Sequence, residues 1–99
     1  MGYKISTKAA EDIEKIWLYT FEHWSLEQAD RYLELIFDEI EYLAAHPTAG
    51  KDFSPVRKHY RRSTVKSHIV FYRHLESGDD IEVIRVLHQR MDIESRLDD

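Results

Sequence analysis

The stretch SLEQADRYLELIFDEIEYLAAHPTAG, residues 25–50, decides the fold, because it specifies one long amphipathic helix with a marked beginning and end. Ser25 and Gln28 form a capping-box pattern, in which each side chain satisfies an exposed backbone amide of the first turn. Apolar residues then recur at the spacing of one helix face: Ala29, Tyr32, Leu33, Ile36, Phe37, Ile40, Leu43 and Ala44. The segment from His46 to Gly50 ends the helix, because proline cannot continue it and glycine accepts left-handed geometry.

A second amphipathic helix is expected almost directly before this one. Ser6 or Thr7 can cap its beginning, since either hydroxyl can accept a hydrogen bond from a free backbone N–H. The expected buried face carries Ala9, Ile13, Ile16, Trp17 and Trp24, with Phe21 at its margin and Thr20 as the one polar interruption. Two abutting helices that share an apolar side form a hairpin. Ahead of them, Tyr3–Ile5 alternates in the manner of a short strand.

The periodicity changes from helical to strand-like after a loop that runs to about Lys58. Strands are expected at residues 60–65, 67–73 and 81–88. Turn residues at 76–80 separate the last two strands, which should therefore pair antiparallel. The centre of 81–87 is apolar on both alternating sets, and this indicates a central strand with a neighbour on each side.

These elements predict an α+β fold. Residues 1–99 are expected to form a single domain, in which a short N-terminal strand and a two-helix hairpin pack on a small antiparallel sheet. Asp92 can cap a last short helix that ends near Leu97. The expected layers are the helical hairpin on one side and the sheet on the other.

The composition excludes several kinds of site. Cysteine is absent, which excludes disulfides, zinc-thiolate sites and thiol nucleophiles. The six histidines include no pair at i, i+4 and no HExxH pattern, and the three glycines form no phosphate-binding loop, so neither a metal nor a cofactor is expected. The sequence has no apolar signal core and no run near the ~18 residues of a membrane span. We therefore expect a cytoplasmic protein without a membrane partner.

The charge is unevenly distributed along the chain. Residues 51–90 hold nine Lys/Arg and five Asp/Glu, a net of +4, which leaves −9 for the rest of a chain whose total is −5. The acidic total argues against general affinity for nucleic acid. A basic strand half and an acidic helical half suit a protein partner that offers complementary charge to one side.

Several short motifs occur in the order in which the RelE/ParE toxin superfamily carries them. They are Ile5-Ser6 before Ala9-Ala10-Glu11-Asp12-Ile13; Trp24 with Gln28-Ala29; Ala45-His46-Pro47 with Gly50; Tyr60-Arg61-Arg62; Ser67-His68 before Ile69-Val70-Phe71-Tyr72-Arg73; and Ile84-Arg85-Val86-Leu87-His88 with Arg90-Met91-Asp92. The motifs span nearly the whole chain and resemble the ParE branch of that superfamily. The resemblance implies a RelE/ParE-like fold and a toxin of a bacterial type II toxin-antitoxin system.

The resemblance to ParE also implies a target and a partner. The implied target is DNA gyrase, which would be inhibited by binding rather than by catalysis. A ParD-like antitoxin would neutralise the toxin in a hetero-oligomeric complex and would make the only contact with operator DNA. Two alternatives stay open: a ribosome-dependent endoribonuclease that cleaves messenger RNA, as RelE-type relatives do, and an inactive toxin that only binds its antitoxin.

A ribonuclease would need an acid-base group and cations for the phosphate. The candidate set for that activity is His88, Arg90 and Arg61. In a regular strand, however, Arg85 faces away from His88, so alternation scatters the strand cations instead of gathering them. No catalytic residue is therefore expected under the leading hypothesis.

Recognition residues can be named for both proposed partners. Leu18, Leu35 and Tyr42 are apolar but lie about 120° or more from the buried stripes of their helices, so they are candidate antitoxin anchors. The candidate basic contacts to an acidic antitoxin tail are Arg57, Lys58, Arg61 and Arg62. The candidate target contacts, in the last segment of the chain, are His88, Arg90 and Met91.

Overall fold

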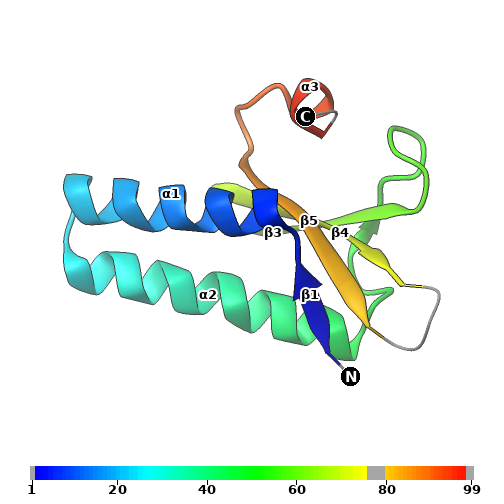
Figure 1. The fold of residues 1–99 in the computed structure, drawn as a ribbon, viewed down its shortest axis with the longest axis horizontal. Coiled ribbons are helices and arrows are strands. Elements are labelled where there is room, and N and C mark those ends of the chain that lie inside the picture. Colours follow the sequence, from blue (N-terminus) through cyan, green and yellow to red (C-terminus); the bar gives the residue numbers. More distant parts are fainter. Residues whose placement is uncertain (1, 76–79, 98–99) are drawn as a thin grey trace.

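The computed structural model describes residues 2–75 and 80–97, and it shows a two-helix hairpin on one face of a five-stranded sheet (Figure 1). In chain order the elements are β1 (Tyr3–Ile5), α1 (Thr7–His23), α2 (Leu26–Ala45), β2 (Lys51–Asp52), β3 (Tyr60–Val65), β4 (His68–His74), β5 (Ile81–His88) and α3 (Ile93–Leu97). The predicted α+β class and the helical hairpin are confirmed. No helix in these ranges is long and apolar enough to cross a membrane.

Serine caps begin both long helices. Ser25 Oγ accepts a hydrogen bond from Gln28 N at 3.0 Å, which confirms the predicted cap of α2. Of the two candidates before α1, Ser6 is the cap: its Oγ accepts from Ala9 N at 3.0 Å and donates to Ile84 O at 2.8 Å. One side chain therefore begins α1 and ties it to β5.

The sheet is mixed, not purely antiparallel as the sequence suggested. Its strand order is β1-β5-β4-β3-β2, and β1 pairs parallel to β5 while the other pairs are antiparallel. The strands β1 and β5 are neighbours although the helical hairpin and three strands separate them along the chain. Periodicity does not reveal such a pairing. The two-residue strand β2 was not predicted, and most of the predicted turn at 76–80 lies outside the described residues.

A β-bulge explains why β5 is apolar on both alternating sets. Phe71 pairs with Arg85 whereas Tyr72 pairs with Val83, so β5 has one extra residue, Ile84, at this step. The bulge lets Val83 and Val86 both enter the core beneath the hairpin, although a regular strand would place them on opposite faces. The strand has a neighbour on each side, as predicted, although β4 is the middle strand of five.

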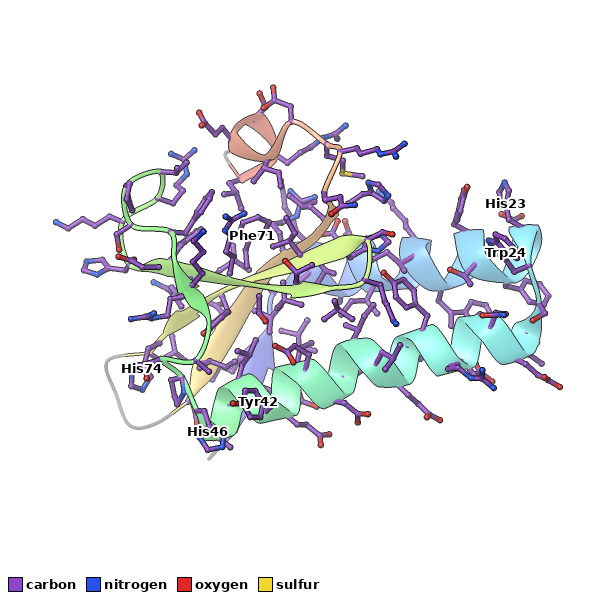
Figure 2. The ribbon with its side chains drawn as sticks, turned by 180° about the vertical axis from the view of Figure 1, so that it is seen from behind. His23, Trp24, Tyr42, His46, Phe71 and His74 are labelled. Atoms are coloured by element: carbon purple, nitrogen blue, oxygen red, sulfur yellow. The ribbon has the colours of Figure 1, made fainter. Side chains whose placement is uncertain are left out.

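Apolar residues cover both faces of the sheet. Val70 and Tyr72 of β4 belong to the larger core cluster, with Ile36 and Ile40 of α2. On the opposite face Phe71 joins a smaller cluster that includes residues of α3 (Figure 2). The short C-terminal helix predicted after Asp92 thus covers the face that the hairpin leaves open.

Tyr72 holds the exit from α2 in place. Its hydroxyl donates to Pro47 O and accepts from Gly50 N, both at 2.9 Å. A Cβ atom at Gly50 would overlap the tyrosine ring, so this glycine is required for the close approach of the loop.

The prediction that Trp24 is buried is wrong. Its side chain is 74 % exposed at the free end of the hairpin, which extends beyond the sheet (Figures 1 and 2). Phe21 is also exposed and stacks on Trp17 with ring centroids 5.4 Å apart. The apolar stripe continues along α1 past the end of the sheet, where the described part of the chain provides nothing to cover it.

Candidate functional site

Two adjoining hollows, of about 590 and 450 Å³, lie between the projecting part of the hairpin and the end of the sheet. They share Tyr19, Thr20, His68 and His88, and together they form what we call the groove. The larger hollow adds Trp24, Gln28, Arg31, Tyr32, Leu35, Lys66 and Ser67, and the smaller adds Asp12, Lys15, Ile16, Val86 and Met91.

The helical wall of the groove is apolar and exposed. Tyr19 is 58 % exposed and Leu35 is 37 % exposed, and both line the groove together with Trp24. Tyr19 stacks on His23 with ring centroids 3.9 Å apart, which holds the tyrosine on the surface of α1. Aromatic side chains that are held at the surface offer a large contact area at little entropic cost, and they are common anchors in protein interfaces.

A tyrosine and two histidines form the floor. The Tyr32 hydroxyl donates to Val65 O at 3.1 Å and lies 2.5 Å from His68 Nδ1. Since the one hydroxyl proton goes to Val65, the contact with His68 is satisfied by a proton on Nδ1. The His68 ring meets the edge of the His88 ring at 5.1 Å, and His88 Nδ1 accepts from Arg90 N at 3.1 Å. These contacts fix α2, the β3–β4 turn and the end of β5 against one another.

Burial, and to a smaller extent the positive charge that His88 can carry, lower the pKa of His68 to about 4. Burial also raises the pKa of Tyr32. At neutral pH the His68 ring on the floor of the groove is therefore uncharged.

Replacing His68 by glutamine is expected to weaken the loss of stability in acid. The pKa of His68 in the folded chain lies below the unfolded value of about 6.5, so protonation favours unfolding. The stability that the chain gains by keeping His68 neutral is fully present above about pH 6.5 and is lost as the pH falls through about 4. This contribution to the free energy of unfolding is below about 3 kcal/mol, because the His68 ring is partly exposed and solvent weakens the effect.

The measurement is urea unfolding at pH 7 and pH 4.5 for the wild type, H68Q and a control, His74→Gln, at an exposed strand end. The wild type and the control should lose more stability than H68Q between the two pH values. Equal losses in all three proteins would show that His68 does not titrate in this way.

Three cations surround the apolar wall: Lys15, Arg31 and Lys66. Among residues 2–75 and 80–97, Asp12 is the one carboxylate that lines the groove, and it is already paired with Arg85 through bonds of 2.7 and 2.9 Å. The groove is thus a locally positive surface on a chain of net charge −5.

Lys66 has a left-handed backbone conformation. It is the first residue of the two-residue turn that the Val65–His68 pair closes, and its φ is 53°. This conformation costs a residue with a side chain about 1 to 2 kcal/mol, which is why glycine and asparagine usually occupy such turn positions. A lysine here is therefore kept at some cost to stability.

The structure separates the predicted antitoxin anchors. Leu18, Leu35 and Tyr42 are all exposed, as expected, but only Leu35 lines the groove. Tyr42 packs on the His46 ring at 4.8 Å, near the end of α2 that is farthest from Trp24 (Figure 2). Of the predicted target contacts, His88 and Met91 line the groove, and Arg90 lies between them in the chain, on the exposed segment after β5.

The predicted basic contacts lie at the opposite end of β3. Arg61 donates to Gly50 O at 2.8 Å, and the Arg62 guanidinium lies 5.6 Å from the centre of the Phe53 ring. Arg57 and Lys58 lie in the loop before β3. Because Arg61 pairs with Tyr72, four residues along β4 from the partner of His88, the set His88, Arg90 and Arg61 is not brought together.

Sequence reasoning missed most of the groove. Tyr19, Arg31, Tyr32 and His68 were not identified as functional residues, and Trp24 was assigned to the core. Tyr19, like Leu18, lies away from Ile13 on the helix, and this was an available signal. No local sequence pattern could have predicted that the β3–β4 turn lies beside α2.

Comparisons with known proteins agree with this architecture. A family model described as "ParE toxin of type II toxin-antitoxin system, parDE" matches residues 3–93. Toxin ParE1 of Mycobacterium tuberculosis is 39 % identical over 95 residues, and Toxin ParE1 of Caulobacter vibrioides is 40 % identical over 95 residues; each match covers 96 % of both chains. A solved chain of the "Chromosomal ParDE TA system from P. aeruginosa" has a TM-score of 0.72 at 22 % identity, covering 89 % of this chain and 95 % of that one.

Proposed function

Because the chain belongs to the ParE toxins of type II toxin-antitoxin systems, we propose that it is a non-enzymatic toxin whose groove binds a target protein, DNA gyrase. A ParD-like antitoxin neutralises it in a hetero-oligomeric complex, and operator DNA is bound only through that antitoxin. The observation that carries the proposal is the apolar, aromatic groove with exposed Tyr19, Trp24 and Leu35. A contiguous apolar surface of this kind is typical of a protein-binding site.

The distribution of the chemical groups supports binding over catalysis. Phosphodiester cleavage needs cations and an acid-base group around one phosphate. Here Arg61 lies at the far end of β3, and Arg85 is held by Asp12 and by Arg96 O. His68 is occupied by its contact with Tyr32. The cations that line the groove with His88, namely Lys15, Arg31 and Lys66, flank an apolar wall, which suits a folded partner better than a bare phosphate.

Neutralisation follows from overlap of the two sites. The proposed antitoxin anchor Leu35 and the proposed target contacts His88 and Met91 line the same groove, so one occupant excludes the other. The proposed basic contacts lie away from the groove, in the loop before β3 and at the start of that strand: Arg57, Lys58, Arg61 and Arg62. From Lys66 to Arg62 is about 13 Å along β3, so an antitoxin that reaches both sites must combine a segment in the groove with an extended tail.

The test is supercoiling of relaxed plasmid by purified gyrase with increasing amounts of the protein, scored also for trapped cleaved DNA. The wild type should inhibit, and added antitoxin should relieve the inhibition. Arg90→Ala and Met91→Ser should each weaken inhibition about tenfold, since truncation of a buried contact commonly costs more than 1 kcal/mol. Val56→Ser, at a similarly exposed apolar residue outside the groove, should inhibit as the wild type does.

Absence of any effect on gyrase would overturn the proposed target. Cleavage of messenger RNA on ribosomes, lost on His88→Ala, would then assign the protein to the endoribonucleases. If the protein affects neither gyrase nor translation on ribosomes but still binds the antitoxin, it is an inactive toxin.

A further inference from the structure

We infer that His88 is a positioning residue: its ring holds the turn that follows β5, and this turn presents Arg90 and Met91 to the target. The inference rests on the proposed function, because it explains how the proposed target contacts are held in place. It gives His88 a role through a hydrogen bond to the backbone, in place of a direct contact with the target.

The three residues that follow β5 all have an acceptor for their backbone N–H. Gln89 N donates to Ser67 O at 2.9 Å. Met91 N donates to His88 O at 3.0 Å, which closes a β-turn that begins at His88. The remaining N–H, that of Arg90, donates to Nδ1 of the His88 ring at 3.1 Å. The turn is therefore closed twice, once by the backbone and once by the side chain of its first residue.

His88 provides an acceptor that shorter side chains usually provide at the first position of a β-turn. Aspartate, asparagine and serine are favoured there, and an asparagine oxygen can accept a hydrogen bond from the N–H two residues on. Nδ1 of histidine is bonded to Cγ, as Oδ1 of asparagine is, so it can accept the same bond. This bond requires the neutral His88 ring with its proton on Nε2.

The His88 ring is held in the orientation that the bond to Arg90 N requires. His88 is the cross-strand partner of His68, and the two rings meet edge to face with centroids 5.1 Å apart. The His68 ring in turn contacts the Tyr32 hydroxyl through Nδ1. The end of β5 and the turn after it are thus fixed against α2 through a series of ring contacts.

The turn decides where the two proposed target contacts lie. Met91 is 43 % exposed and lines the groove, and Arg90 is exposed beside it. Beyond the turn the chain passes to the other face of the sheet, where Leu97 of α3 is buried (Figure 1). Since α3 is anchored by its own packing, loss of the bond from His88 should loosen the turn and leave the fold intact.

The other nitrogen of the ring defines the alternative that the test must separate from positioning. Nε2 of His88 forms no hydrogen bond with residues 2–75 and 80–97, and the ring lines both hollows of the groove. A direct contact with the target would use Nε2, whereas positioning uses Nδ1. Asparagine keeps an acceptor in place of Nδ1, and glutamine keeps a donor near the place of Nε2, so these two substitutions separate the two roles.

The test compares gyrase inhibition by the wild type and by His88→Ala, His88→Asn and His88→Gln. H88A and H88Q should inhibit about five- to tenfold more weakly, because each removes the acceptor of Arg90 N. H88N should stay within about twofold of the wild type. In the background Arg90→Ala/Met91→Ser, H88A should weaken inhibition by less than a further factor of about two, since it acts through contacts that are already removed.

Hydrogen exchange of the Arg90 N–H, followed by NMR, measures the turn without the target. Exchange should be about fivefold faster in H88A and H88Q than in the wild type, and within about twofold of the wild type in H88N. Thermal melting verifies that each variant is folded.

Three patterns of inhibition would overturn the inference. Inhibition that is kept in H88Q and lost in H88N would make His88 a direct contact of the target. Equal loss in all three variants would assign the effect to the packing of the His88 ring on His68, and equal inhibition by all four proteins would leave His88 without a role in binding. If the wild type does not inhibit gyrase, the proposed function fails, and the exchange rates alone decide whether His88 holds the turn.

Discussion

Replacing Asp12 by alanine is expected to lower the free energy of unfolding by about 3 to 5 kcal/mol, because it leaves the Arg85 guanidinium buried without its carboxylate. Asp12 receives three hydrogen bonds: two from Arg85, at 2.7 and 2.9 Å, and one from Val86 N at 3.1 Å. The substitution therefore also leaves a buried backbone N–H without an acceptor. Urea unfolding followed by far-ultraviolet circular dichroism measures the loss.

The matched control replaces both partners by apolar residues, Asp12→Leu with Arg85→Met. Buried ion pairs often contribute little net stability, since the attraction mainly offsets the cost of desolvating the charges. The double variant should therefore be more stable than D12A, although Val86 N still lacks its acceptor. A loss below about 1 kcal/mol in D12A would show that the pair does not join α1 to β5 as described. A double variant no more stable than D12A would mean that the loss of the carboxylate beside the Arg85 guanidinium is not the cause.

Changing Tyr19 and Leu35 together to serine is expected to weaken antitoxin binding about 100-fold, close to 3 kcal/mol, because two of the three exposed apolar anchors of the groove are removed. Both side chains are exposed in the free toxin, so the fold should be retained. Calorimetry or surface plasmon resonance with purified antitoxin measures the change, and thermal melting verifies the fold.

The chain offers a closely matched control in Leu18→Ser/Tyr42→Ser. This pair has the same two residue types and comparable exposure, at 47 % and 52 %, but neither residue lines the groove. If the antitoxin occupies the groove alone, the control should change the affinity by less than about threefold. If the antitoxin also wraps around the outside of the hairpin, both variants should lose affinity. Loss in the control pair alone would contradict a groove site.

The candidate site was less predictable than the fold. Leu35, His88 and Met91 were identified from the sequence, and the structure brings them to one groove. Leu18 and Tyr42 were selected by the same criterion, their position off the buried stripe, and they lie elsewhere. Exposure on a helix can be predicted from local periodicity. Which exposed residues share one hollow depends on how the hairpin sits on the sheet.

The sequence by itself determined the features that depend on neighbouring residues. The Ser25 cap, the exit at Pro47 and the strand periodicity after Lys58 all follow from hydrogen bonds and rotations within one or two turns of the chain. Together with the ordered motifs, they were enough to predict the hairpin, the sheet beside it and the family.

Only the tertiary structure decided which surfaces are covered and which distant groups meet. Trp24 has the periodicity of a core residue and is exposed, because α1 extends past the sheet that would have buried it. Asp12 lies on the same helix and is buried, because Arg85, 73 positions away, reaches it. Local periodicity sets the direction of a side chain, but its burial and its partner depend on packing between segments far apart in sequence, and this packing also forms the groove.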